Sequence, residues 1–223
     1  MVTEPEHNPS LSLLLSLNAG YIDTIGFLAL HGLFTAHVTG NFVTLGASLA
    51  LGVSGLVAKL LALPVFCITV IATRFFALRR AEMNLPGFRI LLVIEVLLLI
   101  GGAGMALCYG PFPNGDSIGT IATGMLLVAA MAIQNAAHRI YFAQIPPTTM
   151  MTGTTTQIMI DVTDILRGLT PETTATRLRR MSVTVITFAA GCGAAALLYM
   201  IVGIGCFAVL PLLGVWMLLL DLG

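Results

Sequence analysis

Charged residues are scarce in this sequence. They make up 9% of its 223 residues, whereas about a quarter is usual in soluble globular domains. No polar stretch is long enough to fold as a separate unit, and the formal net charge of zero gives no sign of a nucleic-acid or acidic partner. The scarcity excludes an ordinary soluble domain and predicts one integral membrane domain over residues 1–223.

Catalytic and metal-binding motifs are also missing. The sequence contains no Gly-x-Ser-x-Gly, His-Glu-x-x-His or Walker lysine pattern. Its four cysteines lie in apolar runs without metal-like spacing. We therefore expect no enzyme activity, no metal site and no cofactor. Residues 1–9 lack the Lys or Arg of a signal peptide, so we expect the first apolar run to stay in the mature protein.

Long apolar runs recur along the whole chain, in which 57% of residues are hydrophobic and the mean hydropathy is +0.99. A helix of about 20 apolar residues crosses a hydrocarbon core of about 30 Å. We predict six membrane-spanning helices at residues 11–31, 56–78, 88–109, 117–142, 181–201 and 206–220.

Two further apolar segments, residues 34–51 and 148–166, each contain a Thr-Gly step. Glycine disfavours helix for reasons of backbone entropy, and Thr and Asn side chains cap helix N-termini. We predict that each segment is interrupted there, with a short helix starting at Asn41 or Thr154. An Asn-Ala step precedes each one, at Asn18 and at Asn135.

The two segments could cross the membrane fully, giving eight spans, or enter and return as re-entrant half-helices, giving six. In the six-span topology with a cytoplasmic N-terminus, the arginines of residues 79–89 and 167–180 share the cytoplasmic side. The loop at residues 111–116, without Lys or Arg, then lies outside, as the positive-inside rule requires. Eight spans would put the two arginine clusters on opposite faces. We therefore predict six spans with both termini cytoplasmic.

Each half of the chain then crosses the membrane an odd number of times, so the second copy must be inverted. The predicted fold is an all-α integral membrane protein with six transmembrane helices and two re-entrant half-helices. These form an inverted repeat of approximately residues 10–110 and 117–220, an architecture common among transporters.

The start of a half-helix would direct unpaired N–H groups and a positive dipole end into the membrane, which suits a small polar or anionic solute. Alternatively, the polar groups near each break only satisfy one another. The candidate substrate-binding residues are Asn18, Tyr21, Asp23, Thr39, Gly40, Asn41, Gln134, Asn135, Thr152, Gly153, Thr154 and Gln157.

Three ionisable residues are candidates for gating or coupling. Asp23 lies near the middle of the first span, where a carboxylate is costly unless it is protonated, paired or facing water. It could bind a proton, a cation or solute, or it could hold the first interruption in place. Asp161 could face the cavity with Arg139 or Arg74 as its partner, and His37 could titrate near neutral pH.

Other ionisable residues allow simpler interpretations. Asn135, His138 and Arg139 lie at helical spacing and could line a vestibule or bind an anion. Arg139 could equally anchor its helix end at the headgroups. We expect Glu95 to pair with an arginine near the cytoplasmic face.

The run Asn18-Ala-Gly-Tyr-Ile-Asp23, followed by Thr39-Gly-Asn41 and Leu45-Gly46, resembles the YoaK-like family of bacterial multi-pass membrane proteins. Gln134-Asn135-Ala136 and Thr152-Gly153 in the second half look like that family too. The likeness covers nearly the whole chain and implies a bacterial inner-membrane protein. It implies no activity, because the function of the family is unknown.

Two hypotheses follow from the residues. The first is a permease or channel-like carrier for a small polar solute bound between the two breaks. The second is a non-transporting membrane sensor, scaffold or assembly subunit. The expected partners are the lipid bilayer and, in the first case, the solute; a homodimer is possible and nucleic acid is not expected.

Overall fold

The computed structural model describes residues 8–169 and 173–222, and most of the N-terminal stretch considered above lies outside these ranges. The described part of the chain is helical and contains no strand. Its elements are α1 (Pro9–Ala29), α2 (Gly40–Leu51), α3 (Leu56–Glu82), α4 (Phe88–Tyr109), α5 (Ile118–Tyr141), α6 (Met151–Leu166), α7 (Thr173–Val202), the 3₁₀ helix η1 (Gly203–Ala208) and α8 (Val209–Leu222).

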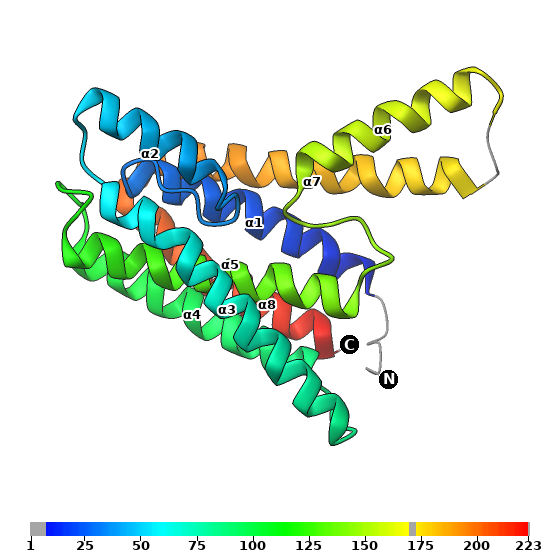
Figure 1. Ribbon diagram of the computed structural model, residues 1–223, viewed down its shortest axis with the longest axis horizontal. Helices are drawn as coiled ribbons and strands as arrows, with labels where there is room; N and C mark the ends of the chain where they lie inside the picture. The colour runs from blue at the N-terminus through cyan, green and yellow to red at the C-terminus, as the bar shows by residue number, and fades with distance from the viewer. Residues whose placement is uncertain (1–7, 170–172, 223) are drawn as a thin grey trace.

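Five helical stretches in the described residues are long and apolar enough to span a membrane. Four are α1, α3, α4 and α5, and the fifth is the continuous stretch Thr174–Leu222, which has 49 residues. Figure 1 shows the chain turning back at η1, so that α8 runs opposite to α7. The predicted class, an all-helical membrane protein with several spanning helices, is therefore confirmed.

Helices α2 and α6 are short. With 12 and 16 residues they are about 18 and 24 Å long at 1.5 Å per residue, less than a hydrocarbon core of about 30 Å. Non-helical segments precede both, at residues 30–39 and 142–150. Helix α2 starts at Gly40, one residue before the predicted start.

The predicted start of the second short helix was wrong. Helix α6 begins at Met151, so Thr152 and Gly153 lie within its first turn and not at an interruption. The break comes earlier, around Pro146 and Pro147. A proline lacks the N–H of a helical bond and restricts the residue before it, whereas a glycine costs a helix only about 1 kcal/mol. The prolines therefore determine this break.

The long helices pack side by side in a bundle, and each short helix lies on one of them (Figure 1). Helix α1 packs along α7, while α5 packs against α3 and α4; α8 lies against α4 and α1. Glycine permits the close approach of α1 and α7, because a Cβ at Gly20 would collide with the carbonyl of Phe188, and one at Gly191 with that of Leu17. Helix α2 rests on α3 and α6 rests on α7.

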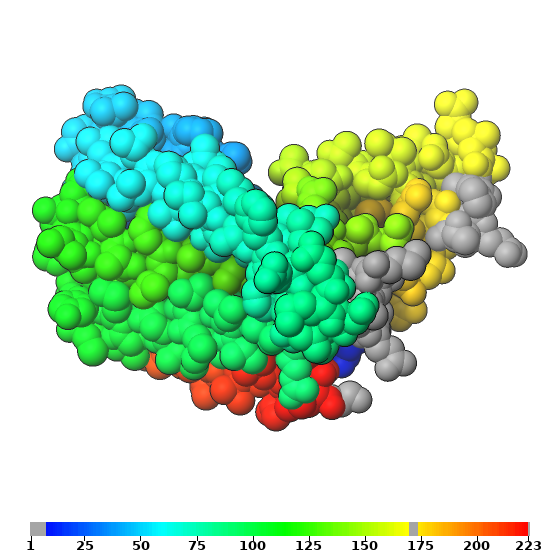
Figure 2. Space-filling model, turned by 60° about the horizontal axis from the view of Figure 1, so that its bottom comes forward, coloured from blue at the N-terminus to red at the C-terminus, as the bar shows by residue number. Residues whose placement is uncertain are grey.

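The two short helices run towards opposite ends of the bundle. The Asp116 carboxylate accepts bonds from the N–H groups of Gly55 and Val57, so α2 ends beside the α4–α5 connection. At the other end, Asn8 donates to the Leu220 carbonyl at 2.8 Å, placing the start of α1 next to the end of α8. Figure 1 shows α6 leading towards this second end, and Figure 2 shows α2 and α6 on either side of a notch in the surface.

Candidate functional site

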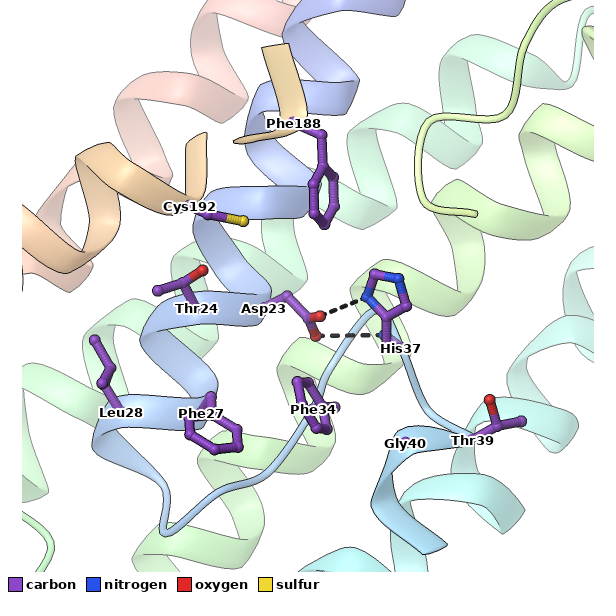
Figure 3. A pocket seen from close by; sticks show the side chains of 10 residues that line it. All are labelled: Asp23, Thr24, Phe27, Leu28, Phe34, His37, Thr39, Gly40, Phe188 and Cys192. Atoms are coloured by element: carbon purple, nitrogen blue, oxygen red, sulfur yellow. Dashed lines mark hydrogen bonds and ion pairs between the residues drawn. The ribbon is translucent and has the colours of Figure 1, made fainter. Parts of the chain in front are cut away.

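The first break is organised around Asp23, whose carboxylate holds the returning chain. Its Oδ1 accepts the backbone N–H groups of Thr35 and Ala36 at 2.8 Å and that of His37 at 3.3 Å. Its Oδ2 lies 2.7 Å from His37 Nδ1 (Figure 3). The left-handed conformation of His31 and Gly32 turns the chain back after α1. Asp23 thus holds the loop and forms an acid–base pair as well.

Asn41 closes the same loop. Its side chain accepts from Phe34 N at 2.9 Å and donates to Phe34 O at 2.7 Å, and the residue is 2% exposed. The side-chain amide of Asn41 is therefore occupied by the chain itself, and it does not line the neighbouring cavity.

The expected unpaired donors at the start of α2 are absent, because the N–H groups of Gly40, Asn41 and Phe42 bond to carbonyls three residues earlier. This tightened first turn satisfies them without a ligand.

A cavity of about 600 Å³ lies beside the Asp23–His37 pair. It is mostly apolar, and aromatic rings form much of its wall (Figure 3). The His37 side chain is 37% exposed, and its ring packs edge-on to that of Phe188, with centroids 5.7 Å apart. The lining residues are Asp23, Thr24, Phe27, Leu28, Phe34, His37, Thr39, Gly40, Phe188 and Cys192.

The second break is held by the amide side chains of α5. Gln134 is buried and donates to Leu15 O and Thr148 Oγ1, each at 3.0 Å, while it accepts from Asn18 at 3.3 Å. Next to it, the Asn135 side chain accepts from the Thr149 hydroxyl. Helix α1 therefore bonds to both breaks. It bonds to the first directly through Asp23, and to the second indirectly, through Gln134 of α5.

A separate cavity of about 380 Å³ lies at the second break. Two guanidinium groups, of Arg74 and Arg139, lie in its wall. Its lining residues are Phe66, Val70, Arg74, Asn135, Ala136, Arg139, Ile140 and Met150, none of which lines the first cavity. Helices α2 and α6 do not pack against each other. The structure thus has one cavity at each break in place of the single shared site that we expected.

Four other predicted site residues lie away from both cavities. The Tyr21 hydroxyl donates to the Cys206 carbonyl at 2.7 Å and links α1 to η1. Thr152 and Gly153 are exposed on the surface of α6. Thr154 is buried, and its hydroxyl donates to Met150 O at 2.9 Å.

The predicted partner of Asp161 was wrong. Asp161 is fully buried and pairs with Arg177 of α7 through two bonds of 2.6 and 3.0 Å. Gln157 donates to the same carboxylate at 2.8 Å. The reason is tertiary, because α6 packs on α7 and so cannot present this face to Arg74 or Arg139. Asp161 and Gln157 hold α6 in place and line neither cavity.

Glu95 does not pair with an arginine as expected. It is 2% exposed, its Oε1 has no hydrogen-bond partner, and it borders the same small void as His138.

Sequence reasoning missed the contribution of α7 to the first cavity. Phe188 and Cys192 belong to a helix that begins well over a hundred residues after Asp23. The glycine-rich run around Gly191 was the available signal, because it allows α7 to lie against α1.

The family model described as "Protein of unknown function (DUF1275)" matches residues 11–220. The chain is 47% identical over 53 residues to the UPF0700 transmembrane protein YoaK of Bacillus subtilis (strain 168). This match covers 24% of the chain and 23% of the relative, so the similarity spans about a quarter of each protein. No solved structure matches. The resemblance noted from the sequence is confirmed.

Proposed function

We propose that this chain, which belongs to the DUF1275 family of proteins of unknown function, is a permease or channel-like carrier for a small polar solute. The solute binds in the cavity beside Asp23 and His37. One observation carries the proposal: a buried carboxylate, costly at membrane depth, pairs with an imidazole that is open to a cavity of about 600 Å³.

The lining of this cavity favours a neutral or cationic solute over an anion. Among the described residues, Asp23 supplies the only carboxylate in the wall, and the first N–H groups of α2 are bonded to carbonyls three residues earlier. A polar group of the solute can bond to His37 and to the Thr39 hydroxyl, while Phe27 and Phe188 cover an apolar part. A pocket with a few polar groups among apolar walls is typical of small-molecule sites.

An inverted repeat of two three-span halves accounts for the packing. Under this proposal α1 to α4 correspond to α5 to α8, and the stretch Thr174–Leu222 crosses twice. Three features support it. The α1–α7 contact has its counterpart in α5–α3; α2 rests on α3 as α6 rests on α7; and each cavity lies between the corresponding helices. Helices α2 and α6 are then re-entrant half-helices.

The distribution of arginine supports a cytoplasmic location for both termini in a bacterial inner membrane. Arg79 and Arg80 lie in the last turn of α3, Arg89 lies in the first turn of α4, and Arg177 lies in the second turn of α7. By the packing described above these positions share the end at which α1 begins, and positive residues favour the cytoplasmic side.

A non-transporting sensor, scaffold or assembly subunit is the second candidate. The observation in its favour is that Asp23, Asn41 and Gln134 are all satisfied by their own chain. Such bonding is what non-helical backbone at membrane depth requires even without a solute. The exposed apolar face of α2, with Phe42 and Val43, suits lipid or a second copy of the chain.

Cys192 allows a direct test, because its thiol lies in the cavity wall. In proteoliposomes containing a Cys67→Ser/Cys108→Ser variant, we would measure uptake of radiolabelled amino acids, sugars, nucleosides and polyamines. A charged, membrane-impermeant methanethiosulfonate should modify Cys192 and reduce uptake at least tenfold. Cys206 is 1% exposed and should not react.

The matched control adds Cys192→Ser, which should keep uptake and lose the sensitivity to the reagent. Uptake of none of these solutes by the unmodified protein, together with an unreactive Cys192, would refute the carrier and favour the second candidate.

A further inference from the structure

Two ionisable side chains outside the proposed solute site border one small void in the bundle. Glu95 of α4 is 2% exposed and His138 of α5 is 6% exposed. Glu95 Oε1 and His138 Nε2 are both buried without a hydrogen-bond partner. The void between the helices has a volume of about 10 Å³ and is lined by Leu15, Phe88, Leu92, Glu95, Gln134, Ala137, His138 and Phe142.

Both unpartnered atoms carry a free-energy cost that a ligand would remove. A buried polar group without a hydrogen bond costs roughly 1–3 kcal/mol, and an ionised carboxylate without a counter-charge costs far more. A void of roughly 10–15 Å³ has room for one water molecule if polar partners are present. The void at Glu95 and His138 is at the lower end of this range, and both residues with an unpartnered atom line it.

We propose that Glu95 and His138 form a buried proton-binding site in which one water molecule joins Glu95 Oε1 to His138 Nε2. With one proton bound, the pair is neutral overall. The proton leaves the carboxylic O–H for the water while the water passes another proton to Nε2. The result is a carboxylate beside an imidazolium, and the reverse step restores the acid. Release of the proton to the aqueous phase leaves one negative charge on the pair.

The site is connected to the second break. The His138 ring lies near the backbone of Pro146, within the non-helical segment before α6. Gln134, which borders the same void, bonds to Thr148 of that segment and to Asn18 of α1. A change in the charge of the pair therefore acts on the backbone that positions α6.

A route for the proton begins at the arginine-rich end. Pro146 also lines a surface cavity of about 360 Å³, together with Arg179, Arg180 and the first turns of α1. One residue thus separates His138 from a cavity open at the surface.

Among the other ionisable groups, Arg139 of α5 lines the cavity at the second break, and its charge acts on the neighbouring His138. The remaining groups on the packed helices have other neighbours. Asp221 of α8 lies 3.8 Å from Arg89 of α4. Tyr141 of α5 contacts Phe88 and lies near Arg74 and Arg80 of α3. On α1, Asp23 is turned to the first break. None of these residues borders the void.

This inference rests on the proposed function in one respect, since it names the proton as the coupling ion of the carrier. The site itself is tested without transport, by infrared spectroscopy of the purified protein in detergent. Wild type at neutral pH should show the carbonyl stretch of a protonated carboxylic acid, shifted in D₂O, and Glu95→Gln should remove it. Asp116→Asn, which changes a carboxylate of the connecting loop, should leave it unchanged.

His138→Gln should move the band, because the water then bonds to an amide. The site would be overturned if wild type lacked the band between pH 6 and 8, or if the band survived in Glu95→Gln. The wild-type measurement needs no variant to fold.

A separate measurement tests the coupling, with whichever radiolabelled solute wild type accumulates. An imposed pH gradient should raise wild-type uptake severalfold and have no effect on Glu95→Gln. A band that behaves as expected without any uptake would refute the carrier and leave the proton site standing. Gradient-driven uptake without the band would refute the site and leave the carrier.

Discussion

At the scale of single residues, the polar side chains of the apolar helices mainly hold broken backbone in place. Asp23 accepts three backbone N–H groups, and Asn41 pairs with both backbone polar groups of Phe34. At the second break, Gln134 donates to the side-chain hydroxyl of Thr148. Because lipid offers no hydrogen bonds, each such side chain replaces the water that a surface loop would have used.

Substitution of Asp23 separates this role from that of its charge. Asp23→Ala leaves three buried N–H groups unpaired at roughly 1–3 kcal/mol each, so the free energy of unfolding should fall by about 3 kcal/mol or more. Asp23→Asn keeps the accepting oxygen and should lose much less. Thermal unfolding in detergent measures both, with the exposed Glu82→Gln as the control. Equal losses in the Ala and Asn variants would show that the loop does not depend on this oxygen.

At the scale of elements, a side chain of the α4–α5 connection caps the start of α3 at one end of the bundle. The Asp116 carboxylate lies in the α4–α5 connection and accepts the N–H groups of Gly55 and Val57 at the start of α3. These two backbone bonds, chiefly that of Gly55, lower the pKa of Asp116, and the nearby Lys59 adds to the effect. The cap joins the start of α3 to the α4–α5 connection, about 60 residues later in the chain.

The capping predicts a pH dependence with a definite sign. Since the folded pKa of Asp116 is lowered, its stabilisation is complete above the unfolded value of about 3.9 and is lost as the pH falls through the folded value. Asp116→Ala should therefore cost about 1 kcal/mol at pH 5–8 and progressively less below about pH 4. Unfolding midpoints of both proteins across this range give the difference. A difference that grew in acid would contradict the assignment of the cap to the ionised form.

At the scale of the whole molecule, two short helices start at breaks within the bundle and run to opposite ends, each beside a cavity of its own. The proposed carrier needs access from each face at different times, and this arrangement supplies one cavity at each break. The mostly apolar cavity holds the Asp23–His37 pair, and the other has Arg74 and Arg139. Helix α1, bonded to both breaks, is the element through which one could act on the other.

The proposed orientation can be tested with single cysteines in a background where the four native ones are replaced by serine. Pro113→Cys, in the α4–α5 connection, should react with an impermeant maleimide added outside intact cells. Met83→Cys, in the α3–α4 connection, should react only after the cells are opened. Reaction of both from outside, or the reverse pattern, would contradict the orientation.

The sequence alone determined the helical membrane class and the approximate helix positions. Apolar runs, turn residues and arginines act within short windows, so the start of α2 was predicted within one residue. The same short-range reasoning gave the wrong start for α6, because a Thr-Gly step was given more weight than the prolines that precede it.

Only the tertiary structure decided which polar groups meet. The partners of Asp161 and Gln134, and the absence of one at Glu95 Oε1, depend on how each helix is rotated about its axis and on which neighbour it faces. The first cavity likewise needs Phe188, brought to Asp23 by the close approach of α7 to α1. Rotation and approach result from packing along whole helices, and no short stretch of sequence specifies them.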